Sequence, residues 1–117
     1  MMRTLVVDDE PLAREYLLSL LADNGDIEVI GTCKNGREAI AAIREESPDL
    51  VFLDIQMPGM NGFDVVKAIQ EDDAMPLFIF ATAYDDYAVE AFDLAAVDYV
   101  LKPLEASRLA RAIERAR

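Results

Sequence analysis

A chain of 117 residues that is 53% hydrophobic and 29% charged fits one globular domain, residues 1–117, with a single hydrophobic core. Its net charge of −12 argues against nucleic-acid contact by this segment, because phosphate groups are bound by clustered Lys and Arg. The absence of histidine and the single cysteine, Cys33, exclude a Ser-His-Asp triad, a zinc site built on His or Cys, and an internal disulfide. No apolar run has the length of a membrane span and no signal peptide opens the chain, so we expect no membrane contact and a cytoplasmic location.

The first third of the chain predicts two strands and two helices. Residues 5–7 are apolar and end in the acids at 8–10, and Pro11 follows in the first turn of a helix, where its missing N–H costs nothing. Residues 27–33 partly alternate, as an edge strand does, and residues 36–46 show helical periodicity. The apolar positions expected on the inner faces of these two helices are Leu12, Ala13, Tyr16, Leu17, Leu20, Leu21, Ala39, Ile40, Ala42 and Ile43.

The remaining two thirds repeat this alternation. Residues 50–53 predict a strand buried on both faces, since four apolar residues in a row are too few for a helix core. The later elements that we expect are a helix over 62–71, a strand over 77–81, a weak helix over 86–92 with Tyr87, Ala88, Ala91 and Phe92 on one face, a strand over 97–101, and a helix over 104–117 with Leu109, Ala110, Ile113 and Ala116 on one side.

Five alternating strands and helices predict an α/β fold. Short crossovers between strands favour parallel pairing with right-handed connections and helices on both faces of the sheet. We therefore expect a flavodoxin-like doubly wound sheet of five parallel strands in the order 2-1-3-4-5, with five helices.

Groups able to do chemistry follow four of the predicted strands. Asp8 and Asp9 follow the first, Asp54 the third, Thr82 the fourth and Lys102 the fifth. Taken singly, the acids could cap turns or helices, Thr82 could be an ordinary strand end, and Lys102 a solvated charge. Because the carboxyl ends of parallel strands share one edge of the sheet, the four groups are expected to meet.

Together these residue types indicate phosphoryl transfer. Crowded carboxylates repel unless a cation lies among them, and oxygen ligands alone favour Mg²⁺. Lys102 adds a positive charge and Thr82 a hydroxyl donor for phosphoryl oxygens, which leaves Asp54 as a nucleophile that forms an aspartyl phosphate.

With these residues in this order, the chain resembles a receiver domain of a two-component response regulator over essentially its full length. The residues that carry the resemblance are Asp8-Asp9, Asp54 within LDIQMPGMNG, Thr82-Ala83, Tyr99, and Lys102-Pro103. The runs at 82–92 and 98–103 are similar to the subgroup whose output module is a LytTR DNA-binding domain.

The resemblance implies a phosphorylation site with a magnesium ion. Asp54 is expected to accept phosphate from a phosphohistidine on a sensor histidine kinase. Mg²⁺ is expected on the side chains of Asp9 and Asp54 and the backbone carbonyl of Gln56, with Asp8 acting partly through water.

The resemblance also implies a switch and an output. Thr82 and Lys102 are expected to hold the phosphoryl group, Tyr99 to change rotamer as Thr82 moves towards it, and the bond before Pro103 to be cis. The switch is expected to control transcription through a LytTR-type domain that lies outside this segment; the alternative is a stand-alone receiver that acts by protein contact or phosphorelay.

Two further hypotheses concern Tyr84 and dimerisation. Gln56 and Tyr84 are expected to flank the phosphoryl group, with Tyr84 shielding it from water. A homodimer is expected through the face made of the fourth helix, fifth strand and fifth helix, where the basic last helix of one copy meets acids of the other; two solvated faces are the alternative. The acids considered are Asp85, Asp86, Glu90, Asp93 and Asp98.

Two other functional classes fit less well. An Asp-nucleophile phosphohydrolase usually carries Asp-x-Asp, whereas Gln56 stands at the second position here, and no extra segment binds a substrate. A nucleotide- or flavin-binding module needs a glycine-rich phosphate loop after the first strand, where this chain has acids. The chain is therefore expected to be a phosphoacceptor switch and not an enzyme.

Overall fold

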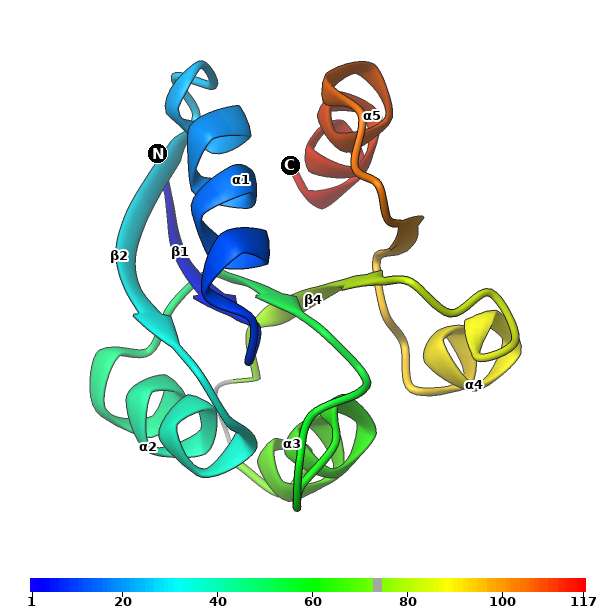
Figure 1. Cartoon of the computed structure of the whole chain (residues 1–117). Helices are drawn as coiled ribbons and strands as arrows, with labels where there is room; N and C mark the ends of the chain where they lie inside the picture. Colours follow the sequence, from blue (N-terminus) through cyan, green and yellow to red (C-terminus); the bar gives the residue numbers. More distant parts are fainter. Residues whose placement is uncertain (73–74) are drawn as a thin grey trace.

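The computed structural model describes residues 1–72 and 75–117 and forms a three-layer α/β fold (Figure 1). The strands have the order β2-β1-β3-β4-β5, and every neighbouring pair is parallel, which confirms the predicted doubly wound sheet. The elements in chain order are β1 (Met2–Val7), α1 (Pro11–Ala22), β2 (Ile27–Cys33), α2 (Gly36–Glu46), β3 (Leu50–Leu53), α3 (Gly62–Ile69), β4 (Leu77–Thr82), α4 (Ala88–Asp93), β5 (Asp98–Leu101) and α5 (Ala106–Ala116).

The helices cover the sheet from both sides, with α1 and α5 on one face and α2, α3 and α4 on the other (Figure 1). The central strand β3 is fully buried and serves both cores: Val51 and Leu53 face α2 and α3, while Leu50 and Phe52 face α1 and α5. Burying side chains of this size stabilises the fold by roughly 1.5–3 kcal/mol each. The continuous apolar run at residues 50–53 is thus explained by a sheet that is covered on both faces.

The second half of the chain shows small differences from the expected boundaries. Helix α4 begins at Ala88, two residues later than expected, because Tyr87 lies at its N-cap position. Helix α5 begins at Ala106 because Leu104 is buried outside the helix, against the core formed by α1 and α5. Helix α3 ends at Ile69 and β5 begins at Asp98.

Four of the apolar residues assigned to inner helix faces are exposed, so these predictions were wrong. Leu12 is 79% exposed and Tyr16 is 48% exposed, and only Leu17 and Leu21 of α1 are buried. Although its ring is partly exposed, the Tyr16 hydroxyl donates a 2.9 Å hydrogen bond to the Leu104 carbonyl.

The other two exposed residues lie on α4 and α5. On α5, Ala110 is exposed and Ala112 is buried instead. Phe92 is 51% exposed because α4 has six residues and buries Ala91 alone. None of the helices that the structure describes has the length and hydropathy needed to cross a bilayer.

Candidate functional site

Residues at the carboxyl ends of β1, β3, β4 and β5 meet at one edge of the sheet. The register of β1 against β3, and of β4 against β5, brings the last residues of these strands level with one another. Asp8 and Asp54 come directly after β1 and β3, Thr82 ends β4, and Lys102 comes directly after β5. Backbone bonds continue past the strands, from Asp54 N–H to the Val7 carbonyl at 3.1 Å and from Lys102 N–H to the Thr82 carbonyl at 2.8 Å.

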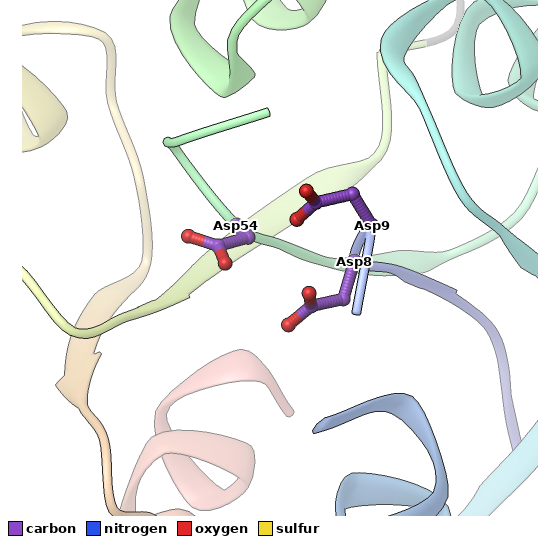
Figure 2. A group of neighbouring side chains, drawn as sticks. All are labelled: Asp8, Asp9 and Asp54. Carbon is purple, nitrogen blue, oxygen red and sulfur yellow. The ribbon is translucent and has the colours of Figure 1, made fainter. Parts of the chain in front are cut away.

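Three carboxylates form the centre of the site. Asp8 and Asp54 are 5% and 6% exposed, Asp9 is half-buried, and one oxygen from each lies within 4.8 Å of the others. Figure 2 shows all three directed to the same side of the sheet edge. Burial, together with the neighbouring charge of Asp8, raises the pKa of Asp9 above its ordinary value. The crowding of like charges that the sequence predicted is therefore present.

Lys102 bridges two of these carboxylates. Its Nζ lies 2.7 Å from Asp8 Oδ2 and 3.0 Å from Asp54 Oδ2, and its side chain is 20% exposed. Burial alone lowers the pKa of Lys102, but the hydrogen bonds to Asp8 and Asp54 outweigh it and raise the pKa above the ordinary value. The ammonium is therefore charged, and it partly compensates the acids at the place where a phosphoryl group would add further negative charge.

The loops hold the carboxylates through the backbone. The N–H of Glu10 donates to Asp8 Oδ1 at 2.9 Å, and the N–H of Gln56 points to Asp54 Oδ1 at 3.4 Å. Arg14, which the sequence reasoning did not single out, donates from Nη1 to the Asp8 carbonyl at 2.7 Å. The sequence signal that could have identified Arg14 is its position in the first turn of α1, a few residues after the acids at 8–10.

Gly62 lets the chain return close to β3 after the turn at residues 54–61. A Cβ on this residue would lie 2.4 Å from the Asp54 carbonyl oxygen and 3.1 Å from the Ile55 Cα. The Gly62 N–H donates to the Ile55 carbonyl at 2.9 Å, and Asn61 with Asp64 forms a capping box that starts α3. Because Gly62 has no side chain, the start of α3 can pack directly against the Asp54 peptide.

Thr82 and Tyr99 lie on the side of the site next to α4. Thr82 is fully buried, and the Tyr84 N–H lies 3.4 Å from its Oγ1. Tyr99 is 8% exposed, and its hydroxyl donates to the Tyr84 carbonyl. Burial raises the pKa of Tyr99, so this hydroxyl remains a donor at neutral pH. The peptide bond between Lys102 and Pro103 is cis.

A contact absent from the sequence reasoning links Gln56 to Tyr87. The side-chain Nε2 of Gln56 donates to the Tyr87 hydroxyl at 2.9 Å, although the two residues are 31 positions apart. Tyr87 had been assigned only to an apolar helix face. Nothing local in the sequence indicates the contact, because it depends on how two loops approach each other.

The donor set fits Mg²⁺. Three carboxylates converge, and oxygen ligands of this kind suit a hard divalent cation better than zinc or copper. The Gln56 carbonyl, in the loop directly after Asp54, belongs to the same group of hard oxygen donors. The site as a whole thus combines a buried carboxylate, acids suited to a cation, a charged lysine and a hydroxyl.

Comparison with known proteins assigns the chain to a family. Residues 4–114 match the model of the response regulator receiver domain. The chain therefore belongs to the receiver domain family of response regulators, which are signalling switches that interact with sensor kinases and bind Mg²⁺ at an acidic site.

Individual relatives agree with this assignment. Transcriptional regulatory protein BtsR from Salmonella typhi is 47% identical over 117 residues, which cover 100% of this chain and 48% of BtsR. Response regulator protein TrrA from Thermotoga maritima, solved in complex with Mg²⁺-BeF, superposes with a TM-score of 0.88 at 37% identity over 100% of both chains. A DNA-binding response regulator of the LuxR family from Staphylococcus aureus gives a TM-score of 0.89 at 28% identity, covering 99% of this chain and 98% of that one. The chain spans about half the length of the curated relatives it matches.

Proposed function

We propose that this chain is the phosphoacceptor domain of a two-component signalling system and that Asp54 takes a phosphoryl group from a phosphohistidine of a sensor histidine kinase. The observation that carries the proposal is the bridging of Asp8 and Asp54 by Lys102 at a site where three carboxylates converge. A nucleophilic carboxylate, acids suited to a cation and a fixed ammonium are the groups that phosphoryl transfer to an aspartate requires.

Each of these residues has a role in the proposed transfer. A carboxylate oxygen of Asp54 attacks phosphorus, and the bond from phosphorus to the kinase histidine breaks. Lys102 is already within 3.0 Å of the Asp54 carboxylate and stabilises the negative charge of the phosphoryl oxygens. Asp8, Asp9, Asp54 and the Gln56 carbonyl are the proposed Mg²⁺ ligands, and bound Mg²⁺ supplies charge neutralisation between the carboxylates and the phosphoryl group.

The proposed switch is the pair Thr82 and Tyr99. The Thr82 hydroxyl lies at the end of β4, where it is placed to donate to a phosphoryl oxygen, and its movement opens space beside Tyr99. Tyr99 is at present buried with its hydroxyl on the Tyr84 carbonyl, so the phosphorylated state is read out by the loop before α4.

The proposed output is transcription, through a LytTR-type DNA-binding domain in a longer protein that acts in the cytoplasm. The similarity of residues 82–92 and 98–103 to that subgroup supports it, as does the printed description of BtsR as a transcriptional regulatory protein. A LuxR-type output is the competing proposal, because structural relatives of that family share the fold. A stand-alone receiver remains the alternative of a different kind.

The proposed dimer uses the face made of α4, β5 and α5. Three apolar side chains are exposed there: Val89 at 75%, Phe92 at 51% and Leu101 at 45%. Acids on and before α4 and arginines on α5 supply opposite charges for a second copy. Asp98 must be removed from the set of acids expected to cross this interface, because it is 1% exposed and bound within the chain by Arg108.

Incubation with acetyl phosphate and Mg²⁺ tests the proposed phosphoacceptor. We expect intact-mass measurement to show a gain of one phosphoryl group in the wild type, no gain in Asp54→Asn, and no gain when EDTA replaces Mg²⁺. Asp64→Asn is a matched control, since it changes another aspartate that follows Asp54 in sequence but lies on α3, and it should be phosphorylated like the wild type. Phosphorylation that persists in Asp54→Asn, or sustained turnover of a phosphate ester, would contradict the proposal.

A further inference from the structure

The Gln56 side chain is held by a residue from another loop. Its Nε2 donates a 2.9 Å hydrogen bond to the hydroxyl of Tyr87. Gln56 is the second residue after Asp54, and its own N–H points to Asp54 Oδ1 at 3.4 Å. The hydrogen bond therefore connects the loop after β3 to the start of α4, directly beside the proposed phosphoacceptor.

The Tyr87 hydroxyl has a fixed position because its ring is supported on two sides. The ring lies edge-to-face against Phe63 of α3, with centroids 5.8 Å apart, and against Tyr84, with centroids 6.1 Å apart. The Tyr87 carbonyl also accepts the Ala91 N–H at 3.0 Å, which anchors the residue at the N-cap of α4. Gln56 thus binds to a preorganised acceptor.

A released Gln56 amide would have groups suited to the hydrolysis of the aspartyl phosphate. The side-chain amide has two donors and an acceptor, which can orient a water molecule towards phosphorus. In that reaction the water oxygen forms a bond to phosphorus, and the bond from phosphorus to Asp54 breaks with its electron pair returning to the carboxylate. One water proton stays on the released phosphate and the other enters the solvent.

We propose that Tyr87 is a positioning residue that holds the Gln56 amide towards α4 and thereby lengthens the lifetime of the phosphoryl group on Asp54. This inference rests on the proposed function. It also gives Tyr84 a different part from the shielding role expected from sequence: the Tyr84 side chain is 47% exposed, and its ring supports the Tyr87 ring. The rings of Phe63 and Tyr84 hold the Tyr87 ring, and with it the Tyr87 hydroxyl, in place. The Tyr87 hydroxyl in turn holds the Gln56 side-chain amide.

The test compares the decay of the phosphorylated protein in Tyr87→Phe and in the wild type. Both proteins are phosphorylated with acetyl phosphate and Mg²⁺, the donor is removed, and intact mass is followed over time. Tyr87→Phe keeps the ring and removes only the hydroxyl, so we expect about fivefold faster decay, the bias that one hydrogen bond of ordinary net strength exerts. In a Gln56→Met background, Tyr87→Phe should change nothing, because the amide that it releases is absent.

Two further variants keep the result specific. Tyr16→Phe is the matched control: it removes a tyrosine hydroxyl that takes part in a hydrogen bond of the same length, 2.9 Å, as donor to the Leu104 carbonyl, and the variant should lose its phosphoryl group at the wild-type rate. Gln56→Asn breaks the bond from the other end with a shorter amide, and it should also decay faster, which keeps the proposal testable if Tyr87→Phe loses its fold.

The outcomes separate the two proposals. A wild-type chain that gains no phosphoryl group overturns the proposed function, and this inference with it. A phosphorylated wild type whose decay equals that of Tyr87→Phe and Gln56→Asn overturns this inference alone. Equal acceleration by Tyr87→Phe with and without the Gln56 amide also overturns it, because the effect would then be a structural one of the ring or the helix.

Discussion

At the scale of single residues, the site depends on one glycine that carries no chemistry. Gly62 begins α3 and lies so close to β3 that a Cβ would be 2.4 Å from the carbonyl oxygen of Asp54. The Asp54 peptide is therefore fixed between the strand that delivers it and the helix that follows the loop. If the Asp54 carboxylate were displaced, it would lose the 3.0 Å hydrogen bond that Lys102 Nζ donates to its Oδ2.

We predict that Gly62→Ala lowers the free energy of unfolding by about 2–3 kcal/mol, since neither the backbone oxygen nor the helix can move freely to admit the methyl group. The same change should slow phosphorylation of Asp54 by acetyl phosphate. Urea unfolding and the rate of mass gain measure the two effects.

Gly25→Ala is the control for Gly62→Ala. A Cβ there meets nothing within 4 Å, and the φ angle is not positive, so stability should stay the same or rise by about 0.4–1 kcal/mol. If Gly62→Ala and Gly25→Ala had the same free energy of unfolding, the prediction that the contact of a Gly62 Cβ with the Asp54 carbonyl destabilises the fold would be wrong.

At the scale of elements, a partly buried ion pair connects β5 to α5. Asp98 at the start of β5 receives two hydrogen bonds from Arg108 of α5, at 2.9 and 2.7 Å, and Arg108 also donates to the Tyr99 carbonyl at 3.2 Å. Burial alone raises the pKa of Asp98, but the hydrogen bonds and charge of Arg108 outweigh it and hold the pKa below its ordinary value of 3.8. Tyr99, one of the two proposed switch residues, thus directly follows a carboxylate held in place by Arg108.

We predict that Arg108→Ala costs about 2 kcal/mol at pH 7, because it leaves the Asp98 carboxylate buried without its main partner. The cost is below the roughly 3–5 kcal/mol for a fully buried pair, since the Arg108 side chain is 31% exposed and Arg115 lies 3.5 Å from Asp98. Urea unfolding at pH 7 gives the value, and Arg111→Ala, an exposed arginine on the same helix, should stay within about 0.5 kcal/mol of the wild type.

The cost of Arg108→Ala should depend on pH in one direction. The folded-state pKa of Asp98 is depressed, so the contribution of the pair is full above pH 3.8 and is lost as the pH falls through the folded-state pKa. The difference between wild type and variant should therefore shrink when unfolding is measured below pH 3.8. A difference that grows on acidification would contradict the assigned direction.

At the scale of the whole molecule, charge both opposes and directs association. The net charge of −12 repels a second copy, whereas α5 presents arginines next to the exposed apolar residues of α4 and β5. A dimer through this face would pair unlike charges around an apolar centre. The phosphorylated state is expected to favour it, because Tyr99 lies in β5 beside the same face.

We predict that Mg²⁺ with beryllofluoride, as a phosphoryl mimic, increases self-association in sedimentation velocity at low salt, and that high salt reduces it by screening. Arg111→Glu on α5 should weaken the association. Arg37→Glu makes the same charge change on α2, which packs on the sheet face opposite α5 and is not part of the proposed dimer face, so it should weaken the association much less. A monomer under every condition, or equal effects of the two variants, would contradict the proposed face.

The sequence by itself determined the order of strands and helices, the parallel sheet and the four groups at its edge. These features follow from local periodicity and from the rule that the carboxyl ends of parallel strands share an edge, and both can be read without knowing any contact. Asp54, Thr82 and Lys102 could be assigned to this edge from the sequence because each comes at the end of an apolar run.

Only the tertiary structure decided how far each helix face is covered and which partner each polar group has. Periodicity shows that a face is apolar but not where its neighbour ends, so Leu12 and Phe92 appeared to belong to the core and are exposed. The bonds of Asp98 with Arg108 and of Gln56 with Tyr87 could not be predicted from the sequence. Hydrogen bonds between segments that are distant in sequence depend on how closely the two backbones approach, and neighbouring residues in the sequence do not indicate this.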